Sequence, residues 1–163
     1  MALRNIVRYP DDGILRKKSE KIEKIDERTQ ILLEDMAETM YASNGVGLAA
    51  VQVGVLRRAV VVDGGTGLLK LVNPVIVEAS GEQQEFESCL SIPRIWGRVR
   101  RPERVVVHAW NEYGWPVDWE ATGFLASAFC HEIDHLDGIL FIDKVLPGSL
   151  LNQNEVEPKA PPA

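Results

Sequence analysis

The feature that most constrains this chain is a stretch near its C-terminal end, Ser127-Ala-Phe-Cys-His-Glu-Ile-Asp-His-Leu-Asp-Gly138, which contains an H-E-x-x-H motif. If the stretch is helical, His131 and His135 lie on one face, one turn apart, and can share a metal ion. Glu132 is turned by about 100° from His131, so its carboxylate can reach a water on the metal without being a ligand. The motif indicates a metal-assisted hydrolase; the alternative is two ordinary helical histidines.

The same stretch is expected to form a buried helix. Thr122-Gly123 can start the helix, and Gly138 can end it as a left-handed residue. Its apolar lining would be Phe124, Leu125, Ala128, Phe129 and Leu136.

Composition indicates a globular protein with one domain. The chain has 163 residues, 45% of them hydrophobic and 26% charged. We expect a catalytic domain over residues 1–150 and a flexible tail over 151–163, where Pro and Glu replace the apolar pattern. The net charge of −6 argues against a nucleic-acid partner.

The chain shows no signal-peptide pattern and no run near the roughly 20 apolar residues of a membrane span. We therefore expect a cytoplasmic protein without a membrane partner. Its two cysteines allow at most one disulfide, and without an export signal a metal or catalytic role is favoured for one of them.

The order of the predicted elements, a helix, strands, a hairpin and a second helix, indicates an α+β fold. We expect a compact single domain of antiparallel strands packed around a central metal-binding helix, with an N-terminal helix. The N-terminal helix should begin at Asp26 and end near 41–44, with Leu32, Leu33, Met36 and Met40 in the core. Strands are predicted at 58–62, 68–77 (bent at Asn73-Pro74), 105–110, 115–119 and 139–142. His108, on the 105–119 hairpin, is interpreted as a structural or surface residue.

A small-residue stretch, Gly45-Val-Gly-Leu-Ala-Ala-Val-Gln52-Val-Gly54, follows the predicted N-terminal helix. Its glycines let the backbone approach a ligand or another segment closely. It is not a dinucleotide-binding fingerprint, because a helix and not a strand precedes it. Gln52 must find hydrogen bonds in apolar surroundings, and by itself it is best explained by bonding to backbone.

A basic cluster lies further along the chain and comprises Arg94, Arg98, Arg100, Arg101 and Arg104. We interpret it as a solvated, partly paired loop. A local role in gripping an anionic group of a substrate is the alternative.

A third metal ligand is sought in Glu87-Ser-Cys-Leu-Ser-Ile-Pro93. Cys130 adjoins His131, so its side chain leaves a different face of the helix and cannot easily join the two histidines. Cys89 lies on a separate segment and can approach from outside. Two histidines and one thiolate would leave a fourth position for water, which is typical of a catalytic metal site.

Three segments together resemble the three motifs of the peptide deformylases, in the right order: Gly45-Val-Gly-Leu-Ala-Ala-Val-Gln52, Glu87-Ser-Cys-Leu-Ser91 and Cys130-His-Glu-Ile-Asp-His-Leu136. The resemblance extends over residues 5–147. Members of that family remove the N-formyl group from the initiator methionine of new polypeptides and release formate. The resemblance therefore implies formyl-methionyl nascent peptides as substrate and a transient contact with the ribosome.

The resemblance also implies a role for each matched residue. Cys89, His131 and His135 match the ligands of one divalent metal, natively Fe(II), which Zn, Ni or Co can replace. Glu132 matches the general acid/base. The side chain of Gln52 and the backbone N–H of Leu90 match the donors to the developing oxyanion.

Substrate binding is assigned to apolar and glycine positions near the motifs. The backbone at Gly45 and Gly47 is expected to meet the substrate, and Val46, Phe124 and Leu125 are hypothesised to line a methionine-sized pocket. Core packing is the alternative for the three apolar residues. Among the nearby carboxylates, Glu87 and Asp134 are candidates to orient the histidine rings; each has an ordinary structural role as its alternative.

Several positions depart from the family pattern. Ser88 replaces the usual Gly, and Cys130, expected to be an inert buried thiol, replaces the usual Gln. Trp96 stands where many relatives carry a substrate-contacting Arg, for which Arg94 or Arg98 could compensate. The tail lacks the basic helix that some members use to dock on the ribosome.

Two other classes of function remain open: a zinc endopeptidase, and a catalytically silent metal-binding domain. The cysteine ligand and the short chain argue against the first, and Glu132, which metal binding alone does not need, against the second.

Overall fold

The computed structural model describes residues 2–10 and 13–152. Its two α-helices are α1 (Glu27–Ala42) and α2 (Gly123–Leu136), and its strands are β1 (Gly47–Ala49), β2 (Ala59–Asp63), β3 (Leu68–Ser80), β4 (Gln83–Cys89), β5 (Ile92–Arg101), β6 (Arg104–Trp110), β7 (Pro116–Thr122) and β8 (Leu151–Asn152). Short 3-10 helices occupy Ile14–Arg16, Ala50–Val53 and Phe141–Asp143. No helix in this part of the chain is long and apolar enough to cross a membrane.

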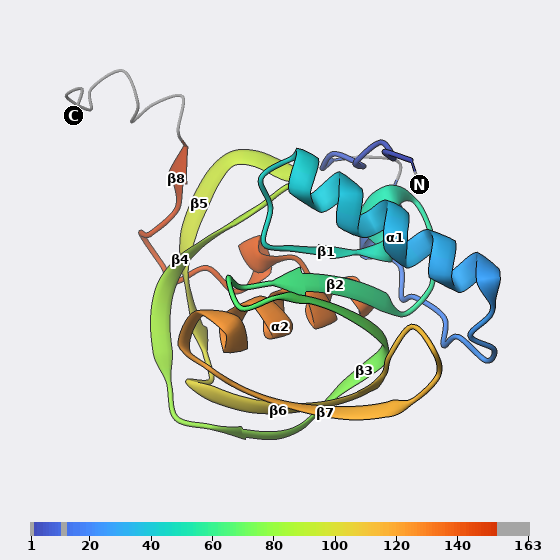
Figure 1. The fold of residues 1–163 in the computed structure, drawn as a ribbon. Coiled ribbons are helices and arrows are strands. Elements are labelled where there is room, and N and C mark those ends of the chain that lie inside the picture. Colours follow the sequence, from blue (N-terminus) through green and yellow to red (C-terminus); the bar gives the residue numbers. More distant parts are fainter. Residues whose placement is uncertain (1, 11–12, 153–163) are drawn as a thin grey trace.

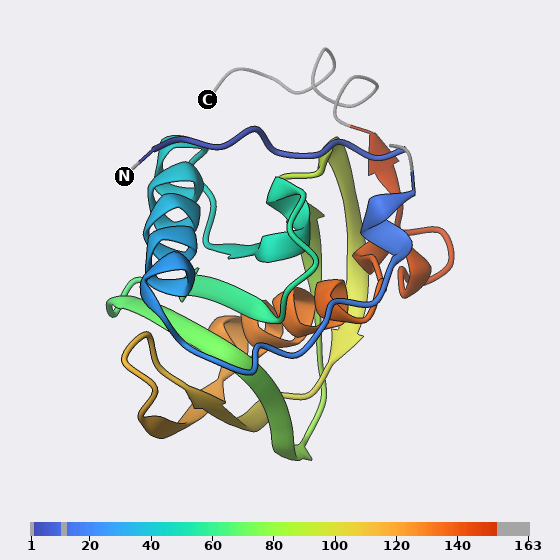
Figure 2. The same cartoon turned by 90° about the vertical axis from the view of Figure 1, so that its right-hand side faces the viewer.

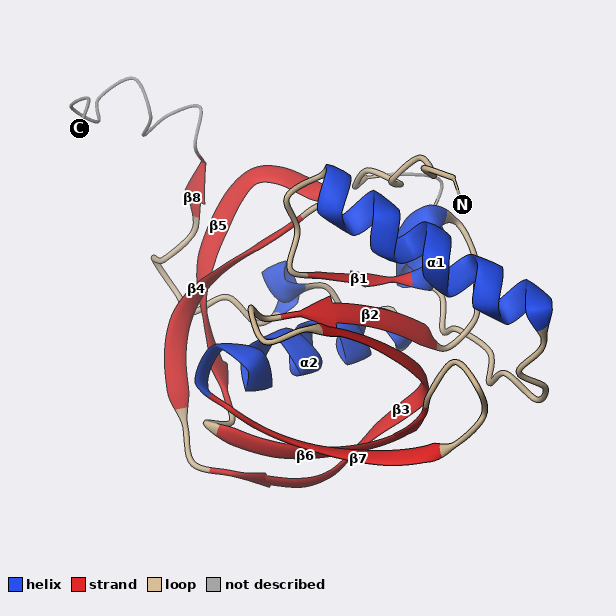
Figure 3. Cartoon of the chain, in the orientation of Figure 1, coloured by secondary structure: helices blue, strands red, loops and turns tan. Residues whose placement is uncertain are grey.

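The strands form two antiparallel sheets that surround α2. One sheet has the order β1-β2-β3-β6-β7, and the other has the order β4-β5-β8. Helix α2 lies in the hollow between them, while α1 covers the other side of β1 and β2 (Figures 1 and 3). The α+β class and the single domain around a central helix, both predicted from the sequence, are confirmed.

Helix α2 is buried on almost every side. Its residues from Ala126 to Ile133 are all buried, and Phe129 is fully enclosed. The chain enters it through Gly123 at φ 59° and leaves it through Gly138 at φ 74°. A side chain at Gly138 would collide with the backbone of Arg16, so this position needs glycine for its conformation and for space. Both predicted helix ends are therefore confirmed.

Helix α1 begins as predicted, because the carboxylate of Asp26 caps it by accepting a hydrogen bond from the N–H of Thr29 at 3.1 Å. Leu33, Met36 and Met40 are fully buried against β1 and β2. The methionines are core residues, as the helical spacing predicted.

The predicted strands at 58–62, 68–77 and in the 105–119 hairpin correspond to β2, β3, β6 and β7. Strand β3 is irregular where it was expected to bend, since its register with β6 shifts between Val72 and Val75 and Asn73 has φ 52°. His108 is exposed on this hairpin and bonds Asp118 at 2.6 Å, which agrees with its interpretation as a surface residue.

The predicted strand at 139–142 is wrong. Leu140 is buried, but the chain turns into the short helix Phe141–Asp143. The carboxylate of Asp143 accepts the N–H of Leu140 at 3.0 Å and pairs with the guanidinium of Arg16. These bonds hold the segment in a turn, which an apolar run alone does not reveal.

The basic cluster is not a loop, because most of it belongs to β5. Val99 and Arg101 point inward and are buried, whereas Arg98 and Arg100 alternate with them and are exposed. Arg98 pairs with Phe86 of β4, whereas Arg94 has the left-handed φ of 69° near the start of the strand. Of the tail expected over 151–163, Leu151–Asn152 forms β8 against β5, and 153–163 lie outside the described residues.

Candidate active site

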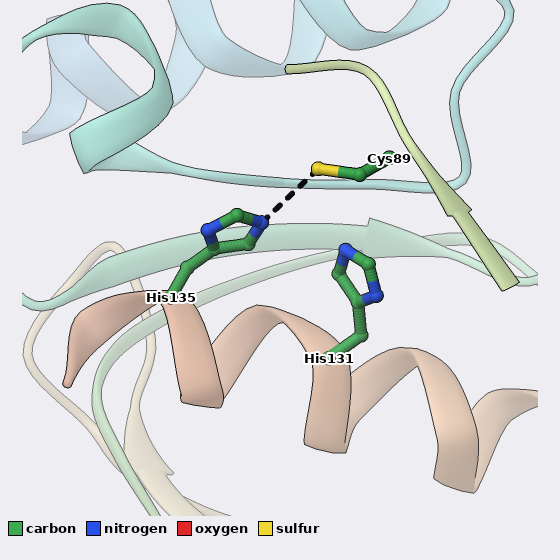
Figure 4. Close-up of side chains that lie close together, drawn as sticks. All are labelled: Cys89, His131 and His135. Atoms are coloured by element: carbon green, nitrogen blue, oxygen red, sulfur yellow. Dashed lines mark hydrogen bonds between the residues drawn. The ribbon is translucent and has the colours of Figure 1, made fainter. Parts of the chain in front are cut away.

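Two histidines of α2 and one cysteine of β4 meet inside the fold. His131 and His135 project from the same face of the helix towards Cys89, at the end of β4 (Figure 4). Ligand atoms of the three side chains lie within 4.8 Å of one another, and Cys89 Sγ is 3.3 Å from His135 Nε2. All three residues are buried. A thiolate and two imidazoles at this spacing suit a divalent transition metal.

His131 is oriented by a buried ion network. Its Nδ1 lies 3.0 Å from Glu87 Oε1, so Nε2 is the ring nitrogen left for a metal. Arg101 donates two hydrogen bonds of 2.9 Å to Glu87 and one of 2.7 Å to Asp134. Asp134 also pairs with Lys144 at 3.0 Å. Glu87 therefore contacts a histidine ring directly, whereas Asp134 acts on the network through Arg101.

Cys130 is separate from this cluster. It is buried, and burial raises the pKa of its thiol to about 11. A thiol that stays protonated at neutral pH is a poor metal ligand, in agreement with its different helix face.

Glu132 is a buried carboxylate next to the cluster. Burial raises its pKa to about 7, against the opposing effect of His131. Its Oε1 has no hydrogen-bond partner among the described residues. Gly47 lies against it so closely that a Cβ there would be 2.5 Å from Glu132 Oε2. The glycine makes room for a carboxylate that is free to exchange a proton.

Gln52 lies in the short helix Ala50–Val53. Its Oε1 accepts the N–H of Ala49 at 2.9 Å, and its Nε2 is 3.1 Å from Ser91 Oγ and 3.5 Å from Cys89 Sγ. The backbone bonding expected of a lone buried glutamine is present, and the amide N–H₂ is at the same time directed towards the cluster.

A cavity of about 370 Å³ opens onto these groups. Most residues assigned to the site from the sequence line it, including Gly45, Gly47 and Leu90. Val46 and Phe124 also line it, but with 43% and 60% of their surface exposed they stand at its open side and are not core residues.

Two assigned residues do not line the cavity. His135 lies beneath it and is 1% exposed. Leu125 packs against the core and next to Gly64. It follows Phe124 on the helix and points about 100° away from it, towards the core and not the opening.

Other residues of the cavity wall were not assigned from the sequence. Phe86 of β4 and Ser127 and Ala128 of α2 belong to this wall. Ser127 and Ala128 stand three to four positions before His131, one turn earlier on the same face, and this spacing could have identified them. Phe86 required the recognition of β4.

The fold and these groups are those of a small metallohydrolase. Three side chains that could hold a metal ion lie at or beside one cavity, together with an amide donor and a carboxylate whose Oε1 has no partner in the described part of the chain.

Comparison with known proteins identifies the family. The family model described as polypeptide deformylase matches residues 3–149. Peptide deformylases of Acetivibrio thermocellus and Caldicellulosiruptor bescii are 58% and 55% identical over 157 residues, which is 96% of this chain and 91% and 93% of theirs. The crystal structure of peptide deformylase from Thermotoga maritima superposes with a TM-score of 0.86 at 40% identity, covering 89% of this chain and 99% of that one.

The chain belongs to the polypeptide deformylase family. Enzymes of this family are metal-dependent hydrolases that remove the N-formyl group from nascent polypeptides, and the resemblance seen in the three sequence motifs is confirmed.

Proposed function

We propose that this chain removes the N-formyl group from the N-terminal methionine of newly made polypeptides and releases formate. The observation that carries the proposal is the meeting of Cys89, His131, Glu132 and Gln52 at one cavity, with His135 buried beside Cys89, in a member of this family. Each of these side chains has a separate task in the hydrolysis of a formyl amide.

Cys89, His131 and His135 would hold one divalent metal ion, natively Fe(II), with Zn, Ni or Co as substitutes in a purified sample. The residues fit such an ion, because Glu87 occupies Nδ1 of His131 and the Nε2 atom of His135 already faces the sulfur of Cys89. When bound, the metal supplies Lewis acidity, which activates water and polarises the formyl carbonyl.

Glu132 is the general acid and base. A carboxylate with a pKa of about 7 can accept a proton from the attacking water and return it to the leaving amine near neutral pH. Its buried, unpaired oxygen supports this role, since a carboxylate bonded to a cation would be a weaker base.

Gln52 and Leu90 stabilise the oxyanion that forms when the formyl carbon becomes tetrahedral. Nε2 of Gln52 is directed to the Cys89 side of the cavity, and Leu90, whose backbone N–H would be the second donor, follows Cys89 in the chain. Loss of one such donor typically costs roughly 3–4 kcal/mol of transition-state stabilisation.

The methionine side chain is proposed to lie against Val46 and Phe124, with the peptide backbone close to Gly45 and Gly47. These four residues line the cavity, and their apolar surface and missing side chains favour a slender apolar group beside an extended chain. Leu125, which points elsewhere, is left out of this pocket.

The proposed substrate indicates where in the cell the protein acts and what it contacts. Chains that begin with formyl-methionine arise on ribosomes of the bacterial type, so we place the activity in the cytoplasm, with transient contact at the ribosome.

The test is an assay with protein purified anaerobically and loaded with Fe(II), offered formyl-Met-Ala-Ser and, in parallel, the unformylated peptide. Formate release from the first peptide, with no cleavage between residues in either, is the expected result. Cleavage within the peptides would identify an endopeptidase. Metal binding without any turnover would leave a silent metal-binding domain and contradict the proposal.

A further inference from the structure

The side-chain amide of Gln52 has only one possible orientation. Gln52 is 1% exposed, and Ala49 donates its backbone N–H at 2.9 Å to one end of the amide. A backbone N–H can only donate, so the end that meets it must be the carbonyl oxygen. The N–H₂ group consequently faces Ser91 and Cys89.

Ser91 fixes where the two amide protons go. Its hydroxyl oxygen lies 3.1 Å from Gln52 Nε2, and the residue is completely buried. One proton is donated to Ser91, and since the two N–H bonds diverge by about 120°, the other is turned to the side of the cavity where Cys89 lies, 3.5 Å from Nε2.

We propose that Ser91 is a positioning residue for deformylation: its hydroxyl holds the Gln52 amide so that the second N–H points at the developing oxyanion. This inference rests on the proposed role of Gln52 as oxyanion donor. Without the Ser91 hydroxyl, the amide would keep its bond to Ala49 and its 3.5 Å contact with Cys89 Sγ, but it would lose the shorter of the two contacts that stop its N–H₂ end from twisting about the last side-chain bond.

The main chain around both residues is held independently of the hydroxyl. The N–H of Tyr9 donates to the carbonyl oxygen of Ser91 at 2.8 Å, and the N–H of Val7 donates to the carbonyl oxygen of Gln52 at 2.7 Å. The N-terminal segment therefore ties the two backbones together, as it crosses this end of the molecule (Figure 2). Removing the hydroxyl should leave the backbone in place, so a variant can isolate its effect.

The experiment is a double-mutant cycle of Ser91→Ala and Gln52→Ala, assayed with formyl-Met-Ala-Ser and with metal content measured for each protein. Ser91→Ala is expected to lower kcat about tenfold, which corresponds to one ordinary hydrogen bond, while KM and metal content stay unchanged. Gln52→Ala should lower kcat by about 10²–10³-fold. In the Gln52→Ala background, Ser91→Ala should cost nothing further, because the group it positions is absent.

Two further variants of nearly equal size separate the loss of the hydroxyl from a change in packing. Ser91→Thr and Ser91→Val add nearly the same bulk and differ by the hydroxyl, so the Thr variant should retain several-fold more kcat than the Val variant. Equal kcat in this pair, or the same loss from Ser91→Ala with and without Gln52, would overturn the inference and leave the proposed function intact. Full activity of Gln52→Ala would instead remove the oxyanion role itself, and the inference with it.

Discussion

At the scale of single residues, two carboxylates of the site, the buried Glu132 and the largely buried Glu87, differ in pKa because their neighbours differ. Burial raises the pKa of both, but for Glu87 the hydrogen bonds from Arg101 and His131 outweigh burial and bring the pKa to about 2. Within residues 2–10 and 13–152, Glu132 has no such partner at Oε1, and burial raises its pKa to about 7. Glu87 is thus a permanent anion that orients a ligand, and Glu132 is a group that can exchange protons.

Replacing Glu132 by Gln should keep the metal and remove most of the turnover. The amide has almost the same shape but cannot accept the proton, and general acid–base catalysis typically contributes about 10²–10⁴-fold. The measurements are kcat with a formylated peptide and metal content by elemental analysis. Loss of the metal would show that Glu132 had been misassigned.

The two cysteines should respond differently to the same change. Cys89→Ala removes the thiolate of the cluster and should abolish stoichiometric metal binding. Cys130→Ala is the matched control, because this thiol is equally buried but lies outside the cluster. Metal titration of both proteins, with the melting temperature as a check on folding, shows which cysteine is needed for metal binding. Equal loss of metal from both would contradict the assignment by helix face.

Residue roles could be predicted where the spacing is local. The positions of His131 and His135 follow from helical geometry, and the motif supplied them at once. Cys89 lies on a second segment: helix geometry favoured it over Cys130, and the three-motif resemblance then matched it to a metal ligand. Arg101 was missed because the run of arginines was interpreted as a solvated loop. In the strand, the buried Arg101 differs from the exposed Arg98 and Arg100 only by its position in the two-residue alternation of side chains.

At the scale of elements, a strand and a helix supply different halves of the site. β4 presents Glu87 and Cys89 two residues apart, so both face inward. α2 presents its histidines four residues apart on the facing surface. The strand was not recognised in the sequence, since Gln and Glu occupy most of Gln83–Cys89 and hide the alternation.

The tight approach of β1 to α2 makes Gly47 a sensitive position. Alanine there would place its Cβ 2.5 Å from Glu132 Oε2 and 2.9 Å from its Cδ, so the carboxylate must move. A displacement of about 1 Å in a catalytic group can cost about 10²-fold in rate, and we expect kcat of Gly47→Ala to fall by that order with the metal retained.

Gly64→Ala is the control for this prediction. Its Cβ would meet only the Leu125 side chain, closest at the flexible Cδ1 atom, 3.1 Å away, and neither residue lines the cavity. Its kcat should stay close to that of the parent protein. A Gly47→Ala enzyme with normal kcat would mean that Glu132 need not hold the position seen in the fold.

At the scale of the whole molecule, β1 and β2 lie between two cores, one built on α1 and the other on α2. The class of fold could be predicted from periodicity, but the pairing of β3 with β6 could not, because the partners come from distant parts of the chain and register depends on which faces are buried together. The N-terminal segment joins α1 to Gln52 and Ser91 beside the site.

The attachment of that segment to α1 should make stability depend on pH. Asp35 is buried and accepts hydrogen bonds from the N–H of Ala2 at 2.8 Å and from Arg4 Nε at 2.9 Å. Burial raises its pKa, but these two donors outweigh burial and bring the pKa below its ordinary value. Because the folded-state pKa lies below the unfolded one, the carboxylate contributes stability above the unfolded pKa, near 4. That contribution is lost as the pH falls through the folded pKa.

We expect Asp35→Asn to lower the free energy of unfolding by about 1–2 kcal/mol at pH 7. The difference from the parent protein should shrink below about pH 4, as measured by urea denaturation at both pH values. Glu27→Gln, on the exposed first turn of the same helix, should show a smaller difference at pH 7; a deficit for Asp35→Asn that persists unchanged in acid would exclude the ion pair as its cause.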